Sequence, residues 1–182
     1  MLSAISLISG MLTWTLLEYL IHRFLGHQKK ENNPITVEHH RHHREGNYFA
    51  PLWKKLLLAA VVVPLIALPA GMLLGFYYAL LFALGLTGTY LFYEVFHKLL
   101  HVMRPLTSYG RWARKHHFYH HFKNPSKNHG VTTPLWDYLF GTYEQVKQPL
   151  RVPQKMAMPW LVKNPEPYRK DYLIISRKAD AC

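Results

Sequence analysis

The sequence predicts an all-α integral membrane protein with about three transmembrane helices and a cytosolic helical cap that holds a histidine-rich site for two metal ions. Three observations carry this prediction: long apolar stretches, a segregated distribution of Lys and Arg, and the clustering of 13 histidines. A length of 182 residues suits one domain, so residues 1–182 are expected to form a single membrane domain.

The apolar residues gather in two parts of the chain. Mean hydropathy is only −0.09, but Lys and Arg are absent from residues 1–22 and 56–97. A helix needs roughly 20 apolar residues to cross the hydrocarbon core of a bilayer. We therefore predict spans at about residues 2–21, 56–74 and 76–97.

The basic residues predict how these spans are oriented. Seven of the 22 Lys and Arg residues lie in 23–55 and the other fifteen in 98–182. Three spans place both segments on one side, which the positive-inside rule makes cytoplasmic. The loop 23–55 and the cap 98–182 are thus expected in the cytosol, at a bacterial inner membrane or the endoplasmic reticulum.

The net charge of +12 does not point first to nucleic acid, because no nucleic-acid-binding motif accompanies it. A basic face beside anionic lipid headgroups explains the charge more simply, and it could also attract an acidic redox partner. The single cysteine, Cys182, excludes an intramolecular disulfide and a cysteine-based metal site. Residues 2–21 lack a basic start and a clear cleavage site, which favours a retained anchor over a signal peptide.

Twelve of the histidines fall in four clusters, which read HRFLGH from 22, HHRHH from 39, HKLLH from 97 and HHFYHH from 116. Imidazole is the commonest protein ligand for iron, zinc, copper and nickel. A single cluster of this kind is at least as often a surface feature as a metal site. Four of them at the cytosolic ends of predicted spans indicate a metal centre. Ten candidate ligands, enough for two metals at about five each, are His22, His27, His39, His42, His43, His97, His101, His117, His120 and His121.

The spacing within the clusters predicts the local backbone structure that would bring the histidines together. On a straight helix His22 and His27 would point about 140° apart, so both reach one metal only if the helix loosens near Gly26. A short helix over residues 36–44 would hold three ligands within one turn, and an amphipathic segment is expected at 107–123. The tail, rich in proline between 149 and 167, is expected to cap the membrane face with short elements.

Several neighbouring groups are candidates for supporting the ligands without binding metal. Glu18 lies one turn before His22 and is expected to accept its second ring N–H, although an interfacial acid is the alternative. Glu94 begins a stripe that continues through His97 on one helix face. His40 points away from the other histidines of its cluster, and His116 fits the site only in an alternative register.

At this point the chain resembles the fatty acid hydroxylase and sterol desaturase superfamily of membrane di-iron enzymes. The strings EYLIHRFLGH, YEVFHKLLH, KHHFYHH and NHGVTTPLWDYLFGT carry this resemblance over most of the chain. It implies a helical membrane anchor, a histidine-lined cytosolic cap, and the ten histidines as ligands of two Fe ions. It also implies that Glu94 and Asp137 orient ligands, whereas His129 stands where many relatives carry an aromatic residue.

The implied reaction is O2-dependent insertion of oxygen into a C–H bond of a fatty acyl or related lipid chain. Without a fused haem-binding string, electrons are expected from an external ferredoxin or b-type cytochrome with its reductase. Alternatives within the superfamily are a carotenoid hydroxylase and a sterol or lipid desaturase, but YFAPLW and TTPLWDYLFGT favour the fatty acid hydroxylase side. Zinc would also bind such a site in a recombinant sample.

Two other classes compete with this interpretation. A membrane zinc hydrolase would act without O2 or reductant. A metal transporter, a metal sensor or a di-haem cytochrome would need histidines deep in the membrane, whereas these cluster at the ends of the spans.

Overall fold

The computed structural model describes residues 1–176, so Cys182 lies outside the described residues. Helix α1, Leu2–Leu20, continues without a break as a π-helical segment, Ile21–Gly26. Helix α3 is Leu52–Leu74 and helix α4 is Phe76–Val102. All three are long and apolar enough to cross a membrane, which confirms the predicted number of spans.

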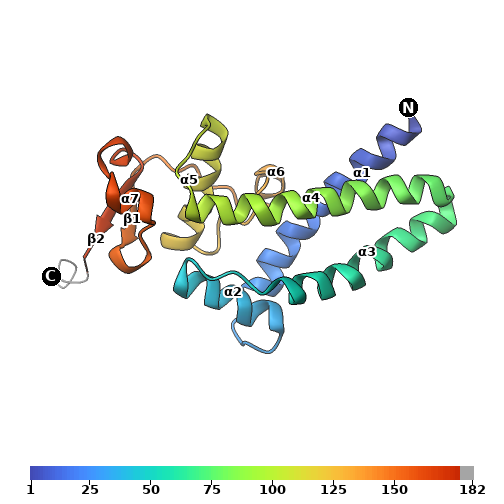
Figure 1. The fold of residues 1–182 in the computed structure, drawn as a ribbon, viewed down its shortest axis with the longest axis horizontal. Coiled ribbons are helices and arrows are strands. Elements are labelled where there is room, and N and C mark those ends of the chain that lie inside the picture. Colours follow the sequence, from blue (N-terminus) through green and yellow to red (C-terminus); the bar gives the residue numbers. More distant parts are fainter. Residues whose placement is uncertain (177–182) are drawn as a thin grey trace.

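Helices α3 and α4 each extend beyond the predicted span at one end. Helix α3 begins four residues earlier than expected, and α4 continues five residues beyond 97, through His101. Figure 1 shows these ends gathered at one side of the molecule, while the N-terminus and the turn between α3 and α4 lie at the other. Four of the ten ligand candidates, His22, His27, His97 and His101, therefore lie at or just beyond the ends of the spans. The other six lie within Pro34–Glu45 and Ser108–Phe122.

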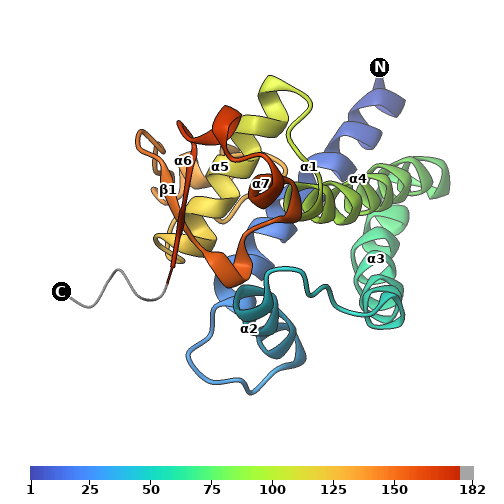
Figure 2. The ribbon, with the colours of Figure 1, turned by 60° about the vertical axis from the view of Figure 1, so that its left-hand side comes forward.

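Helix α4 packs between α1 and α3 (Figure 2). The crossing with α1 is close because two glycines meet backbone: a Cβ added at Gly10 would lie 2.0 Å from the Phe82 carbonyl oxygen, and one at Gly85 would lie 2.1 Å from that of Leu7. Small residues allow such backbone contact between membrane helices. Trp14 packs nearby against α4.

The remaining elements form the cap beside these ends (Figure 1). Asn33 accepts a hydrogen bond from the Thr36 N–H at 2.9 Å, and this N-cap together with Pro34 begins the first cap helix. The elements are α2 (Pro34–Glu45), α5 (Ser108–Phe122), α6 (Leu135–Leu139), α7 (Pro159–Lys163), strands β1 (Leu150–Pro153) and β2 (Tyr172–Ile175), and 3-10 turns at Gln154–Met156 and Glu166–Tyr168.

The two strands are an element that the sequence analysis missed. They pair in parallel, with Leu150 opposite Tyr172, and their buried side chains pack against Phe118 of α5. The protein is thus mostly helical, but its cap is not helical throughout as expected, because it also contains these two strands. This small sheet packs against α5 at Phe118. The same helix carries the last histidine cluster.

Candidate metal centre

The structure brings the ten candidate ligands together in two groups of five. Within each group every residue offers a ring nitrogen, and these nitrogens lie within 4.8 Å of one another. The first group is His22, His27, His39, His43 and His120; the second is His42, His97, His101, His117 and His121.

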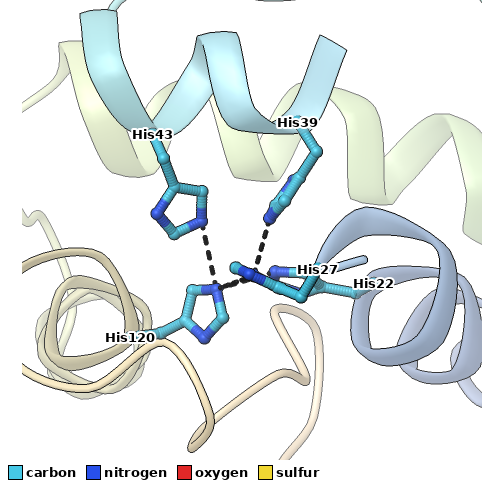
Figure 3. Close-up of side chains that lie close together, drawn as sticks. All are labelled: His22, His27, His39, His43 and His120. Atoms are coloured by element: carbon cyan, nitrogen blue, oxygen red, sulfur yellow. Dashed lines mark hydrogen bonds between the residues drawn. The ribbon is translucent and has the colours of Figure 1, made fainter. Parts of the chain in front are cut away.

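The first group is assembled from three segments that are distant in the sequence (Figure 3). The π-helical segment Ile21–Gly26 supplies His22 and positions His27 directly after it. Because a π-helix repeats after about five residues rather than four, the two rings come to one side and stack with centroids 5.3 Å apart. The expected loosening near Gly26 is therefore a change of helix type.

Helices α2 and α5 each serve both groups. Residues four apart share a helix face, so His39 and His43 join the first group while His42 joins the second. In α5 the arrangement is reversed, with His120 in the first group and its neighbours at i−3 and i+1 in the second. The two HxxHH motifs therefore bridge the two groups.

The separations within each group fit a shared metal ion. In the first group Nε2 of His120 lies 2.9 Å from Nε2 of His22, 2.8 Å from that of His27 and 3.1 Å from that of His43. In the second, Nε2 of His117 lies 3.0 Å from that of His97. Ligand nitrogens about 2.1 Å from one metal and at right angles to each other are about 3 Å apart.

Backbone carbonyls show which ring nitrogens carry hydrogen. Nδ1 of His22 donates to the His129 carbonyl at 2.5 Å, and Nδ1 of His120 donates to the Lys127 carbonyl at 2.8 Å. A carbonyl only accepts, so both neutral rings keep a lone pair on Nε2. Two lone pairs facing each other at 2.9 Å repel, and a cation between them removes that repulsion.

In the second group a backbone carbonyl also selects the ring tautomer of a histidine. Nδ1 of His42 donates to the Tyr48 carbonyl at 2.7 Å, while its Nε2 is buried without a hydrogen-bond partner among the described residues. Both ring nitrogens of His121 are likewise buried and unpartnered in the described part of the chain. Unsatisfied buried nitrogens are costly unless a ligand occupies the space between them.

Burial keeps these rings in the neutral form that binds metal. Burial lowers the pKa of His42 to about 4, and burial with the neighbouring His129 lowers the pKa of His27 to about 4. Burial also holds the pKa of His117 well below its usual range. All three rings are therefore neutral at pH 7, as a metal ligand must be.

Glu18 supports the site by a different contact from the one expected. Its carboxylate accepts the backbone N–H groups of Val131 and Thr132, at 2.5 and 3.1 Å, and the Thr132 hydroxyl at 2.5 Å. The ring of His22, one turn further along, donates instead to the carbonyl of His129. Glu18 thus holds the loop that orients the ligand, rather than the ligand itself.

Asp137 organises the same loop. It accepts hydrogen bonds from the backbone N–H groups of His129 and Gly130, each at 2.8 Å, and from the Thr142 hydroxyl at 2.7 Å. Burial alone would raise the pKa of this carboxyl, but these bonds and one from His116 hold the pKa below its usual range. Asp137 is therefore an anion that fixes the backbone beside the first group.

The other neighbouring histidines lie outside both groups. His116 contacts Asp137 at 3.2 Å and is enclosed by aromatic rings. His129 is buried beside the first group, with its ring 5.2 Å from that of His120, and contributes its carbonyl. His40 contacts Glu31 at 3.0 Å on the exposed side of α2.

Two features of the site had no signal in the sequence. One is the set of backbone carbonyls, at Tyr48, Lys127 and His129, that select the ring tautomers. The other is an ion pair between Glu94 and Lys55, in the place where Glu94 was expected to orient a ligand. Contacts of these kinds depend on the fold and not on a local motif.

Comparison with known proteins identifies the family of this chain. Residues 7–142 match the family model described as fatty acid hydroxylase. The chain belongs to this family. Among fatty acid hydroxylase relatives, a dihydroceramide fatty acyl 2-hydroxylase of Arabidopsis thaliana is 34% identical over 156 residues, covering 76% of this chain and 60% of the relative. A fatty acid 2-hydroxylase of Rattus norvegicus is 37% identical, covering 73% of this chain and 38% of the relative.

A solved structure of the family has the same fold. Full-length scs7p, in which only the hydroxylase domain is visible, matches with a TM-score of 0.67 and 31% identity, covering 81% of this chain and 58% of that one. The chain therefore spans three fifths or less of the length of these fatty acid hydroxylase relatives.

Proposed function

We propose that this chain is an O2-dependent hydroxylase of fatty acyl lipids in which two Fe ions are held by the two groups of five histidines. The single observation that carries the proposal is the pair of all-imidazole groups, with lone pairs already directed inward by backbone hydrogen bonds. When bound, such an iron pair supplies the reduction of O2 and the transfer of one oxygen atom into an unactivated C–H bond.

A cavity beside the histidines supports a lipid substrate. Its volume is about 530 Å³, within the roughly 300–1,000 Å³ of small-molecule pockets. It lies between α2, α3 and α4, and its lining includes a histidine of the first group, His39, and two of the second, His42 and His97. Apolar residues such as Phe49 and Val61 form much of the rest.

The chain's own residues do three things in this proposal. The carbonyl partners hold the imidazoles in one tautomer, so the site is organised before any substrate arrives. Apolar walls exclude water from the reacting carbon, which protects the reaction from side products. Helix α3, whose described residues are all exposed or half-buried, borders the cavity and offers an acyl chain a route from the bilayer.

The cellular setting is part of the same proposal. The whole chain acts as one membrane domain with its histidines on the cytoplasmic side, where most Lys and Arg residues lie. The membrane is a bacterial inner membrane or the endoplasmic reticulum. Electrons come from an external ferredoxin or b-type cytochrome with its reductase, and the basic cytosolic face attracts such an acidic partner.

The decisive experiment compares lipids with and without the functional chain. Iron-loaded protein in membranes, given O2 and a reductant, should produce hydroxylated acyl lipids that carry oxygen from labelled O2. The same preparation should be inactive without O2 or with His97→Ala, because that ring belongs to the second group. Activity that persists without O2 and reductant would contradict the proposal and favour a hydrolase, and products with a new double bond would identify a desaturase.

A further inference from the structure

The apolar cavity contains two ion pairs in its wall. Lys54 pairs with Glu38, and Lys55 pairs with Glu94. In the second pair both side chains are 22% accessible, whereas in the first pair the Lys54 side chain is 38% accessible and that of Glu38 is 17% accessible. The four charges cancel, so the wall offers polar groups without net charge.

The pair of Lys55 and Glu94 lies close to the proposed reaction centre. Glu94 precedes His97 by three residues in α4, which places both on one face about 4.5 Å apart along the helix axis. Both line the cavity. On α3, the lining residues that follow Lys55 are apolar: Leu57, Leu58 and Val61.

This arrangement suits the carbonyl of an acyl lipid. The Lys55 ammonium has three hydrogens, and one bond to Glu94 leaves donors for a second acceptor. A carboxylate ligand would meet the like charge of Glu94, whereas an amide or ester carbonyl is a neutral acceptor. The acyl chain attached to that carbonyl can then lie along the apolar lining of α3.

We propose that Lys55, held in place by Glu94, binds the carbonyl oxygen of the acyl substrate and thereby determines which carbon is hydroxylated. The inference rests on the proposed function. Glu94, which pairs with Lys55, lies one helical turn from His97, so a carbonyl bound at Lys55 would place the carbon next to it nearer the histidines than carbons further along the chain. Lys55 is then a specificity-determining residue for attack beside the carbonyl.

The test is the position of the new hydroxyl on the acyl chain of a saturated dihydroceramide, located by mass spectrometry. Wild type should attack the carbon beside the carbonyl. Lys55→Met should raise KM about tenfold or more, since a hydrogen bond to a charged group is lost, and should spread the hydroxyl to other carbons. Lys55→Arg, which keeps a charged donor, should restore both values.

The matched control is Lys98→Met, which removes an equal charge on the exposed side of α4, outside the cavity lining. It should leave KM and the hydroxyl position unchanged. If Lys55→Met hydroxylates the same carbon with the same KM, or if Lys98→Met changes both equally, the ion pair is only structural and the inference is overturned.

A second measurement separates this inference from the proposed function. Binding of the same dihydroceramide should raise the thermal unfolding temperature of wild type and Lys98→Met under anaerobic conditions, and at the same lipid concentration it should raise that of Lys55→Met clearly less. This readout needs neither O2 nor reductant, so it tests the carbonyl site even if wild type hydroxylates nothing. Equal stabilisation of Lys55→Met would contradict it.

Discussion

Replacing His120 with alanine should remove one metal ion from the protein and leave the other. Its Nε2 lies within 3.1 Å of the Nε2 atoms of His22, His27 and His43, so the first group loses its central member. Metal content, measured by mass spectrometry on purified protein, should fall from about two to about one per chain, because the first group loses the ring whose nitrogen lies closest to three of the other four. Hydroxylation should fall to background.

The matched control is His40→Ala. It removes a ring from α2 next to two ligand candidates, but His40 contacts Glu31 on the exposed side and belongs to neither group of five. This variant should keep both metals and its activity. Equal metal content in His120→Ala and His40→Ala would show that the first group does not bind metal as described.

The second large effect is expected at the crossing of α1 and α4. Adding a single methyl group at Gly85 places it 2.1 Å from the Leu7 carbonyl oxygen, which is backbone and cannot turn away. Gly85→Ala should therefore separate the helices and destabilise the fold by about 1–3 kcal/mol or more. Because the π-helical continuation of α1 positions ligands of the first group and α4 carries ligands of the second, metal binding should weaken as well.

Gly88→Ala provides a control on the same helix. A Cβ at this position meets nothing within 4 Å, and alanine favours helix over glycine by roughly 0.5–1 kcal/mol. Its thermal unfolding temperature in detergent should equal or slightly exceed that of wild type, whereas that of Gly85→Ala should be clearly lower. A Gly85→Ala protein as stable as Gly88→Ala would contradict the close crossing.

Much of the fold and of the ligand set could be predicted from the sequence because both depend on residue patterns within short segments. Apolar length and the absence of Lys and Arg located the three spans, and the i, i+3 and i+4 spacings located ten histidines that the structure gathers. Even the need for an irregular helix followed from the spacing of His22 and His27. The structure shows that irregularity as a π-helix.

The rest depended on contacts between distant segments. Glu18 shares a helix face with His22, yet it binds backbone more than a hundred residues away. Spacing decides which histidines of one helix share a group, but which segments contribute to the same group follows from how they pack together. The two strands were not predicted because each has only four residues, too few to show a clear alternation of apolar and polar side chains.

The most direct test of the central claim is the metal content and coordination of the wild-type chain. Protein purified anaerobically after growth with iron should contain about two Fe per chain, and X-ray absorption should show nitrogen neighbours at about 2.0–2.2 Å with imidazole scattering. A single metal per chain, or a coordination shell with sulfur or mainly carboxylate oxygen, would contradict two all-histidine sites.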